Sequence, residues 1–73
     1  MISNLPDELT IYEVFARQRR EEPLQQIGTV SAVNADLAAA YARSIYDEEP
    51  WIEMSLIARR DMVPVITLEG APR

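Results

Sequence analysis

The sequence of 73 residues contains no cysteine, no histidine and no lysine, and all seven of its basic residues are arginine. Without cysteine the chain has no disulfide, no thiolate nucleophile and no soft metal ligand. Histidine is the commonest general base and the commonest nitrogen ligand of zinc, copper and iron, and lysine is the side chain that forms Schiff bases. These absences argue against independent catalysis, so we expect an accessory protein with no catalytic residues, no metal site and no cofactor.

Positive charge and long apolar runs are also scarce. Twelve acidic residues against seven arginines give a net charge of −5, which disfavours unselective binding to nucleic acid or to anionic lipid. The apolar runs are far shorter than a bilayer span, and the chain does not begin with a basic segment followed by an apolar one. We therefore expect a cytoplasmic protein with no nucleic-acid partner and no membrane partner.

What is present is the composition of a globular domain in a short chain. Hydrophobic residues make up 48% of the sequence and charged residues 26%, and the apolar residues are spread in short runs. A domain of this size buries only a small core, which stabilises the fold marginally. We therefore expect association with partner proteins or with further copies of the chain, as a homodimer or higher homo-oligomer.

The hydrophobic pattern predicts a small α+β domain with the element order β-β-α-β. The strands are expected at about 11–19, 24–33 and 51–59, and the helix at about 35–46. A short fourth strand at 63–68 is also considered, which Pro64 limits to a sheet edge or to pairing with another chain. One domain, 10–68, is expected between a flexible leader, 1–9, and a tail, 69–73.

The most characteristic segment is 27–43, which is typical of a strand that turns directly into a capped helix. Asn34 is placed to accept hydrogen bonds from the first helical turn, and the alanine-rich stretch after it has high helix propensity. Gly28 is expected to mark a bulge or a close approach to a large side chain. A stripe at spacings of three and four is expected to lie on the sheet, namely Leu37, Tyr41, Ser44 and Ile45.

Connection rules predict how the strands are arranged. Strands one and two should pair antiparallel, and a right-handed crossover through the helix should place strand three beside strand one, giving the spatial order 2-1-3. Alternation in strand three assigns to the core Ile52, Met54, Leu56 and Ala58. Because one helix covers one face, the other face should remain as an apolar surface that marks an interface.

Seven residues are candidates for that interface, three apolar and four basic: Phe15, Trp51, Ile57, Arg17, Arg19, Arg59 and Arg60. The apolar side chains either anchor an interface or pack within the chain. The arginines either bind a partner's carboxylates or a coenzyme's phosphates, or they are solvated and pair with Glu21 and Glu22. Acidic clusters at 7–8, 21–22 and 47–49 lie beside prolines in predicted connections and are interpreted as solvated side chains.

Several segments together resemble a known family, in an order and spacing that agree over residues 11–63. They are 12–17 (YEVFAR), 28–32 (GTVSA), 35–38 (ADLA) leading to Ala42, Arg43 and Tyr46, and the exit 57–63 (IARRDMV). This pattern resembles the small B subunit of phenylacetyl-CoA epoxidase, the PaaB family. The sequence departs from the family pattern at 24–27, where the family has histidines, and at 47–49, where it has a basic pair.

The resemblance implies a non-catalytic subunit of a multicomponent monooxygenase that converts the aromatic ring of phenylacetyl-CoA to its 1,2-epoxide in aerobic phenylacetate degradation. In that family the di-iron centre belongs to the A subunit, and the B subunit bridges A and C subunits. The expected partners are therefore A-type and C-type oxygenase subunits. The residues alone leave a second function open, a small acyl-CoA-binding or regulatory domain that acts through its sheet face and its arginines. An independent enzyme is the third possibility.

Overall fold

The computed structural model describes residues 8–68 of the chain. Within this part the elements are, in chain order, β1 (Thr10–Arg17), β2 (Gln25–Ala32), α1 (Ala35–Ile45), β3 (Glu53–Ala58) and a short 3-10 helix, η2 (Arg59–Asp61). The expected leader lies mostly outside the described residues, and the expected tail, 69–73, lies wholly outside them.

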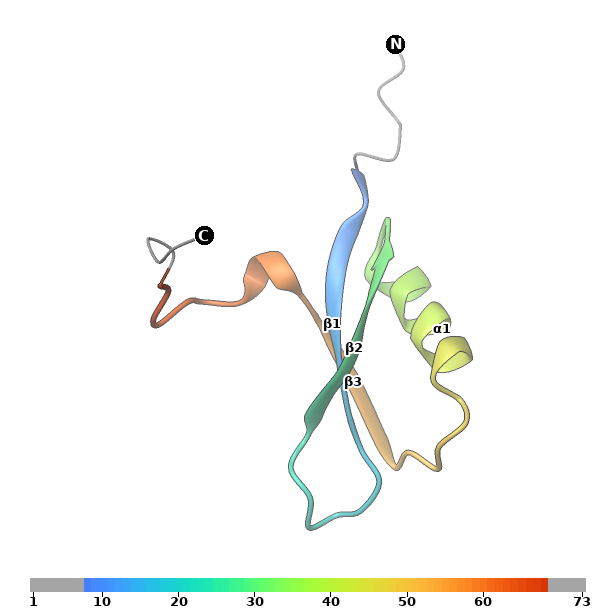
Figure 1. The fold of residues 1–73 in the computed structure, drawn as a ribbon. Helices are drawn as coiled ribbons and strands as arrows, with labels where there is room; N and C mark the ends of the chain where they lie inside the picture. Colours follow the sequence, from blue (N-terminus) through green and yellow to red (C-terminus); the bar gives the residue numbers. More distant parts are fainter. Residues whose placement is uncertain (1–7, 69–73) are drawn as a thin grey trace.

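The three strands form one antiparallel sheet in the order β2-β1-β3, and α1 lies on one side of it (Figure 1). The central strand β1 is rich in β-branched and aromatic residues, which favour a pleated strand covered on both sides. Tyr12 lies opposite Val30 on β2 and opposite Ala58 on β3. The predicted α+β class, the β-β-α-β order and the spatial order 2-1-3 are confirmed.

Local signals define both ends of α1. At its start the side chain of Asn34 accepts a hydrogen bond of 2.8 Å from the backbone N–H of Leu37, as the sequence predicts. Asp36 in the first turn and Arg43 in the last turn both complement the helix dipole. At its end the N–H of Tyr46 donates to the carbonyl of Ala42, 3.0 Å away, and the chain then turns through the connection that contains Pro50.

The helix meets the sheet through alanines, and the predicted stripe of larger residues is wrong. Ala38 and Ala42 are buried, whereas Leu37, Tyr41 and Ile45 are between 40% and 58% exposed. Small side chains let the helix axis approach the strands closely, so the alanines face the sheet and the larger side chains point outward. The core consists of Tyr12, Val14, Val30, Ala32, Ala38, Ala42 and Ala58.

Gly28 allows a second close approach between the helix end and the sheet. The pairing of β1 with β2 shifts register between Val14 and Phe15, directly beside Gly28. A Cβ on Gly28 would lie 2.7 Å from Cζ of Tyr46, so the tyrosine ring occupies the space that a side chain would fill. The expectation of a bulge or a close approach is confirmed on both counts.

The structure corrects two further expectations. Residues 63–68 form no strand, because η2 turns the chain away from the sheet and Pro64 has no N–H to donate. Strand three is shorter than predicted and begins at Glu53. A tight turn at Pro50 precedes it, in which the N–H of Trp51 donates to the carbonyl of Glu49 at 2.8 Å. Ile52, assigned to the core from the sequence, is 53% exposed.

Candidate interaction surface

The face of the sheet opposite α1 carries an exposed apolar pair beside a buried charge. Ile11 near the start of β1 and Ile57 on β3 are 40% and 38% exposed, and Phe15 is half-buried. These residues share a face because their positions on β1 and β3 have the parity opposite to that of the core residues Tyr12 and Val14. α1 lies on the other face, so these three residues form the uncovered sheet face, with η2 beside Ile11.

Glu13 is the buried carboxylate of this face, and its partners come from distant parts of the chain. Its side chain is only 9% exposed. One carboxylate oxygen accepts a hydrogen bond from Nε2 of Gln26 on β2, and the other accepts from Nε of Arg59 in η2, each at 2.5 Å. A buried charge is tolerated when it is paired and hydrogen-bonded. The network therefore fixes η2 against β1 and makes the centre of the uncovered sheet face polar rather than purely apolar.

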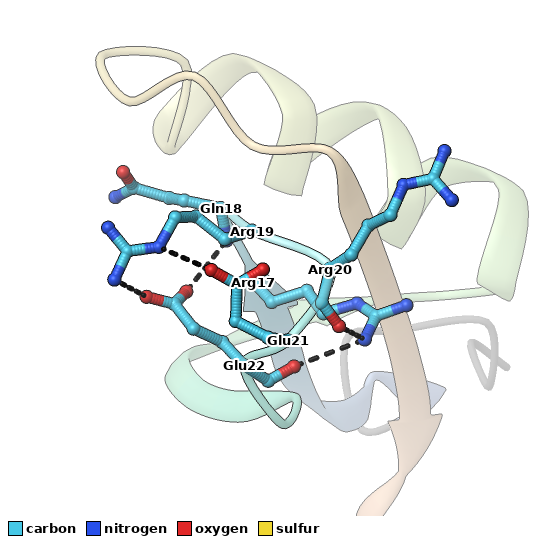
Figure 2. A network of polar contacts seen from close by, with 6 residues as sticks. All are labelled: Arg17, Gln18, Arg19, Arg20, Glu21 and Glu22. Carbon is cyan, nitrogen blue, oxygen red and sulfur yellow. Dashed lines mark hydrogen bonds and ion pairs between the residues drawn. The ribbon is translucent and has the colours of Figure 1, made fainter.

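The side chain of Arg17 binds backbone carbonyls of the connection between β1 and β2. Its Nη1 donates to the carbonyls of Arg20 and Glu22, at 2.8 and 3.1 Å (Figure 2). Its Nε lies 2.7 Å from a carboxylate oxygen of Glu53 on β3. The guanidinium group thus has both backbone and carboxylate partners within the chain. A ligand phosphate or a partner's carboxylate would have to displace them.

Arg19 pairs with the acidic residues of the same connection. Its Nε lies 3.3 Å from Glu21 and its Nη2 lies 3.6 Å from Glu22 (Figure 2). The interpretation that strand-end arginines pair with Glu21 and Glu22 is therefore confirmed for Arg19. The side chain of Arg20 points away from this network (Figure 2). Exposed pairs of this kind contribute little stability, so they order the connection more than they stabilise the fold.

Trp51 lies apart from the uncovered sheet face. Its indole N–H donates to the carbonyl of Tyr46 at 2.7 Å, so the ring lies at the C-terminal end of α1. There it lines a shallow hollow together with Ile27 and Ile45. Of the seven candidate residues, the sheet and η2 bring together Phe15, Arg17, Ile57 and Arg59, while Trp51 and Arg19 lie elsewhere.

Arg60 anchors η2 to the start of the sheet. Its Nη1 donates to the side-chain hydroxyl of Thr10 at 2.9 Å, next to the Arg59–Glu13 pair. Both arginines of η2 therefore bind groups on β1. This contact links residues 50 positions apart in the chain, which no local sequence pattern indicates.

Two features of the surface were not predicted from the sequence. One is a groove between α1 and β3, lined by Ala39, Ala42, Arg43, Met54, Ser55 and Leu56. The alanines of α1 could have indicated this groove from the sequence. A helix with small side chains that lies beside β2 does not reach across β3, which is therefore partly open. The other is the exposure of residues 63–68, whose apolar side chains at Val63, Val65, Ile66 and Leu68 are between 75% and 90% exposed.

Two properties of the described residues bear on other functions. Between residues 8 and 68 there is no group of three or more acidic, histidine or cysteine side chains arranged to hold a metal ion. The 11 residues of α1 are about half of the roughly 20 that a helix needs to span a bilayer, and no helix in this part of the chain is long and apolar enough to do so.

No protein-family model, curated protein or solved structure matches this chain. The likeness to the epoxidase B subunit therefore rests on the sequence segments quoted above.

Proposed function

We propose that this chain is a non-catalytic structural subunit that holds together the di-iron oxygenase subunits of a multicomponent phenylacetyl-CoA ring 1,2-epoxidase. The family likeness of residues 11–63 suggests the complex, and the lack of histidine, cysteine and lysine fits a subunit that leaves the chemistry to others. The observation that carries the proposal is the uncovered sheet face, where exposed isoleucines flank a rigid ion pair.

The uncovered sheet face has the composition of a protein–protein interface. Ile11 and Ile57 supply apolar area, and Phe15 supplies a half-buried aromatic ring. The pair of Glu13 and Arg59 holds its charges in fixed positions, so a partner meets a preorganised pattern. Apolar patches with fixed polar groups beside them are typical of interfaces between subunits.

The arginines favour this function over binding of an acyl-CoA. Arg17 and Arg59 already bind the carboxylates of Glu53 and Glu13, so a phosphate that replaced either carboxylate would break an internal pair. The carboxylate left behind at Glu13 would be buried and short of a partner. A coenzyme phosphate held in this way would oppose the internal network, whereas a docked protein can leave it intact.

Co-expression with A-type and C-type oxygenase subunits tests the proposal. We expect this chain to co-purify with both, and Ile57→Glu to reduce the recovered complex at least about tenfold, because it places a charge in the apolar patch. Ala40→Glu, an exposed change on α1 away from the uncovered sheet face, is the matched control and should leave recovery unchanged. Failure of the wild-type chain to associate with either subunit would refute the proposal.

Calorimetry with phenylacetyl-CoA on the isolated chain separates the second function from the first. Bridging predicts no saturable binding. Saturable binding that Arg17→Ala or Arg59→Ala abolishes would replace the bridging proposal with an acyl-CoA-binding one.

A further inference from the structure

The C-terminal segment 63–68, here called the arm, exposes more apolar surface than any other described segment of its length. Val63, Val65, Ile66 and Leu68 are all at least 75% exposed, and the arm runs away from the sheet on the side opposite α1 in Figure 1. Isolated exposed apolar residues are ordinary, but four within six positions of an extended segment indicate a surface that another protein covers. β-branched residues also favour pairing as a strand.

The arm does not lie on its own sheet in the structure, where the contacts of η2 hold the segment before it against β1. Arg59 binds Glu13 and Arg60 binds Thr10, and both partners lie on β1, on the inner side of β3. In Figure 1 the chain leaves β3 through η2 and runs on away from the sheet, so the arm does not pair with β3 of its own chain.

The free edge of β3 has the matching surface. β3 is an outer strand, so its outward-facing backbone groups have no strand partner in the described structure. Beside this edge, the groove between β3 and α1 exposes the half-buried side chains of Met54 and Leu56. A strand added here would gain main-chain hydrogen bonds and would lay alternate side chains over the groove, as in β-augmentation.

Pro64 is compatible with one register of such an added strand. In a strand, the N–H and C=O groups of alternate residues point to the same side. If Val63, Val65 and Thr67 bond to β3, then Pro64 points outward, where its missing N–H is not needed. The proline then also protects the new edge from further pairing.

We infer that the arm of one copy of this chain adds as a strand to the β3 edge of a second copy, and that the two copies exchange arms reciprocally. Donor and acceptor lie on the same chain, so a reciprocal exchange closes a two-fold symmetric dimer. The exchange covers both the arm and the groove, and it keeps η2 bound to β1 in each copy. The inference concerns the isolated chain and holds whether or not oxygenase subunits bind the uncovered sheet face.

Cross-linking between single-cysteine variants tests the exchange directly, because the natural chain has no cysteine that would compete. Val65→Cys in the arm is mixed with differently tagged Ser55→Cys on β3, and a short bismaleimide is added. We expect cross-links between the two tagged chains. Thr29→Cys, an exposed position on the other outer strand, is the matched control and should cross-link at least about tenfold less.

Two further measurements complete the test. Sedimentation should give twice the mass of the chain, and Val65→Asp with Ile66→Asp should return the monomer mass with an unchanged circular-dichroism spectrum, because both side chains are exposed. A monomeric wild-type chain, or a dimer that survives the double substitution, would overturn the inference. So would cross-links within one chain of a Ser55→Cys/Val65→Cys variant at every concentration, since the arm would then lie on its own sheet.

Discussion

Gly28→Ala should destabilise the fold, although alanine is ordinarily the better residue in a strand. The hydroxyl oxygen of Tyr46 would be the nearest atom to the added Cβ, with Cζ at 2.7 Å and Cε1 at 3.2 Å, so the tyrosine side chain must move. Overpacking of this kind costs about 1–3 kcal/mol. The intrinsic gain from replacing glycine is about 0.5–1 kcal/mol. Subtracting this gain from the overpacking cost leaves a net loss of up to about 2.5 kcal/mol, which lowers the Tm of a domain of this size by up to about 20 °C.

A double-mutant cycle identifies the cause of that loss. In a Tyr46→Ala background the space beside Gly28 is empty, so the same substitution should stabilise by about 0.5–1 kcal/mol. Urea unfolding at one fixed protein concentration, followed by circular dichroism and by the fluorescence of Trp51, measures all four variants. An equal loss from Gly28→Ala in both backgrounds would refute the argument that Tyr46 fills this space.

Three further predictions concern the cap and the ion pairs. Asn34→Ala should lower the free energy of unfolding by about 1 kcal/mol in urea, whereas Asn34→Asp should keep the wild-type value, because Asn and Asp can both cap α1. An equal loss from both substitutions would exclude capping. Arg59→Met should lower the free energy of unfolding by about 1–3 kcal/mol and Glu13→Gln by clearly less, since only the first leaves a buried carboxylate short of its partner. The reverse order in thermal melts would contradict the assignment of this ion pair. Arg19→Ala should change stability by less than about 0.5 kcal/mol, because both of its ion pairs are exposed, and a larger loss on urea unfolding would count against that account.

The order of the elements and the topology could be predicted because they depend on local signals and on general connection rules. Alternation of side chains identifies the strands, Asn34 marks the helix start, and the handedness of the crossover puts β3 beside β1. Gly28 was also informative, since a lone glycine within a strand of β-branched residues implies a close neighbour. Its partner, Tyr46, could not be named, because the contact depends on how α1 ends.

The orientation of the helix could not be predicted from hydrophobicity. Leu37, Tyr41 and Ile45 give the stronger apolar stripe, but the sheet is met by Ala38 and Ala42. The choice depends on how closely two backbones can approach, which is a tertiary property. Trp51 was expected in strand three, but it precedes β3, and its indole N–H donates to the carbonyl of Tyr46 at the end of α1. This contact is also a tertiary property.

Of the ion pairs of the candidate surface, the sequence predicts those between neighbours in the chain but not those between distant residues. Arg19 and its acidic neighbours are close in sequence, so their pairing follows from proximity. Glu13 and Arg59 are 46 residues apart, and nothing local to either indicates the other. The single chain has no strand at 63–68 because strand propensity does not supply a strand partner, and the expected alternative, pairing with another chain, stays a prediction.

The central claim, that this chain bridges oxygenase subunits, is tested most directly by native mass spectrometry of A-type and C-type subunits co-expressed with and without it. The account predicts an assembly that contains all three chains and that separates into smaller species when this chain is omitted. An assembly of A-type and C-type subunits that has the same mass in both samples, with this chain free in solution, would contradict it.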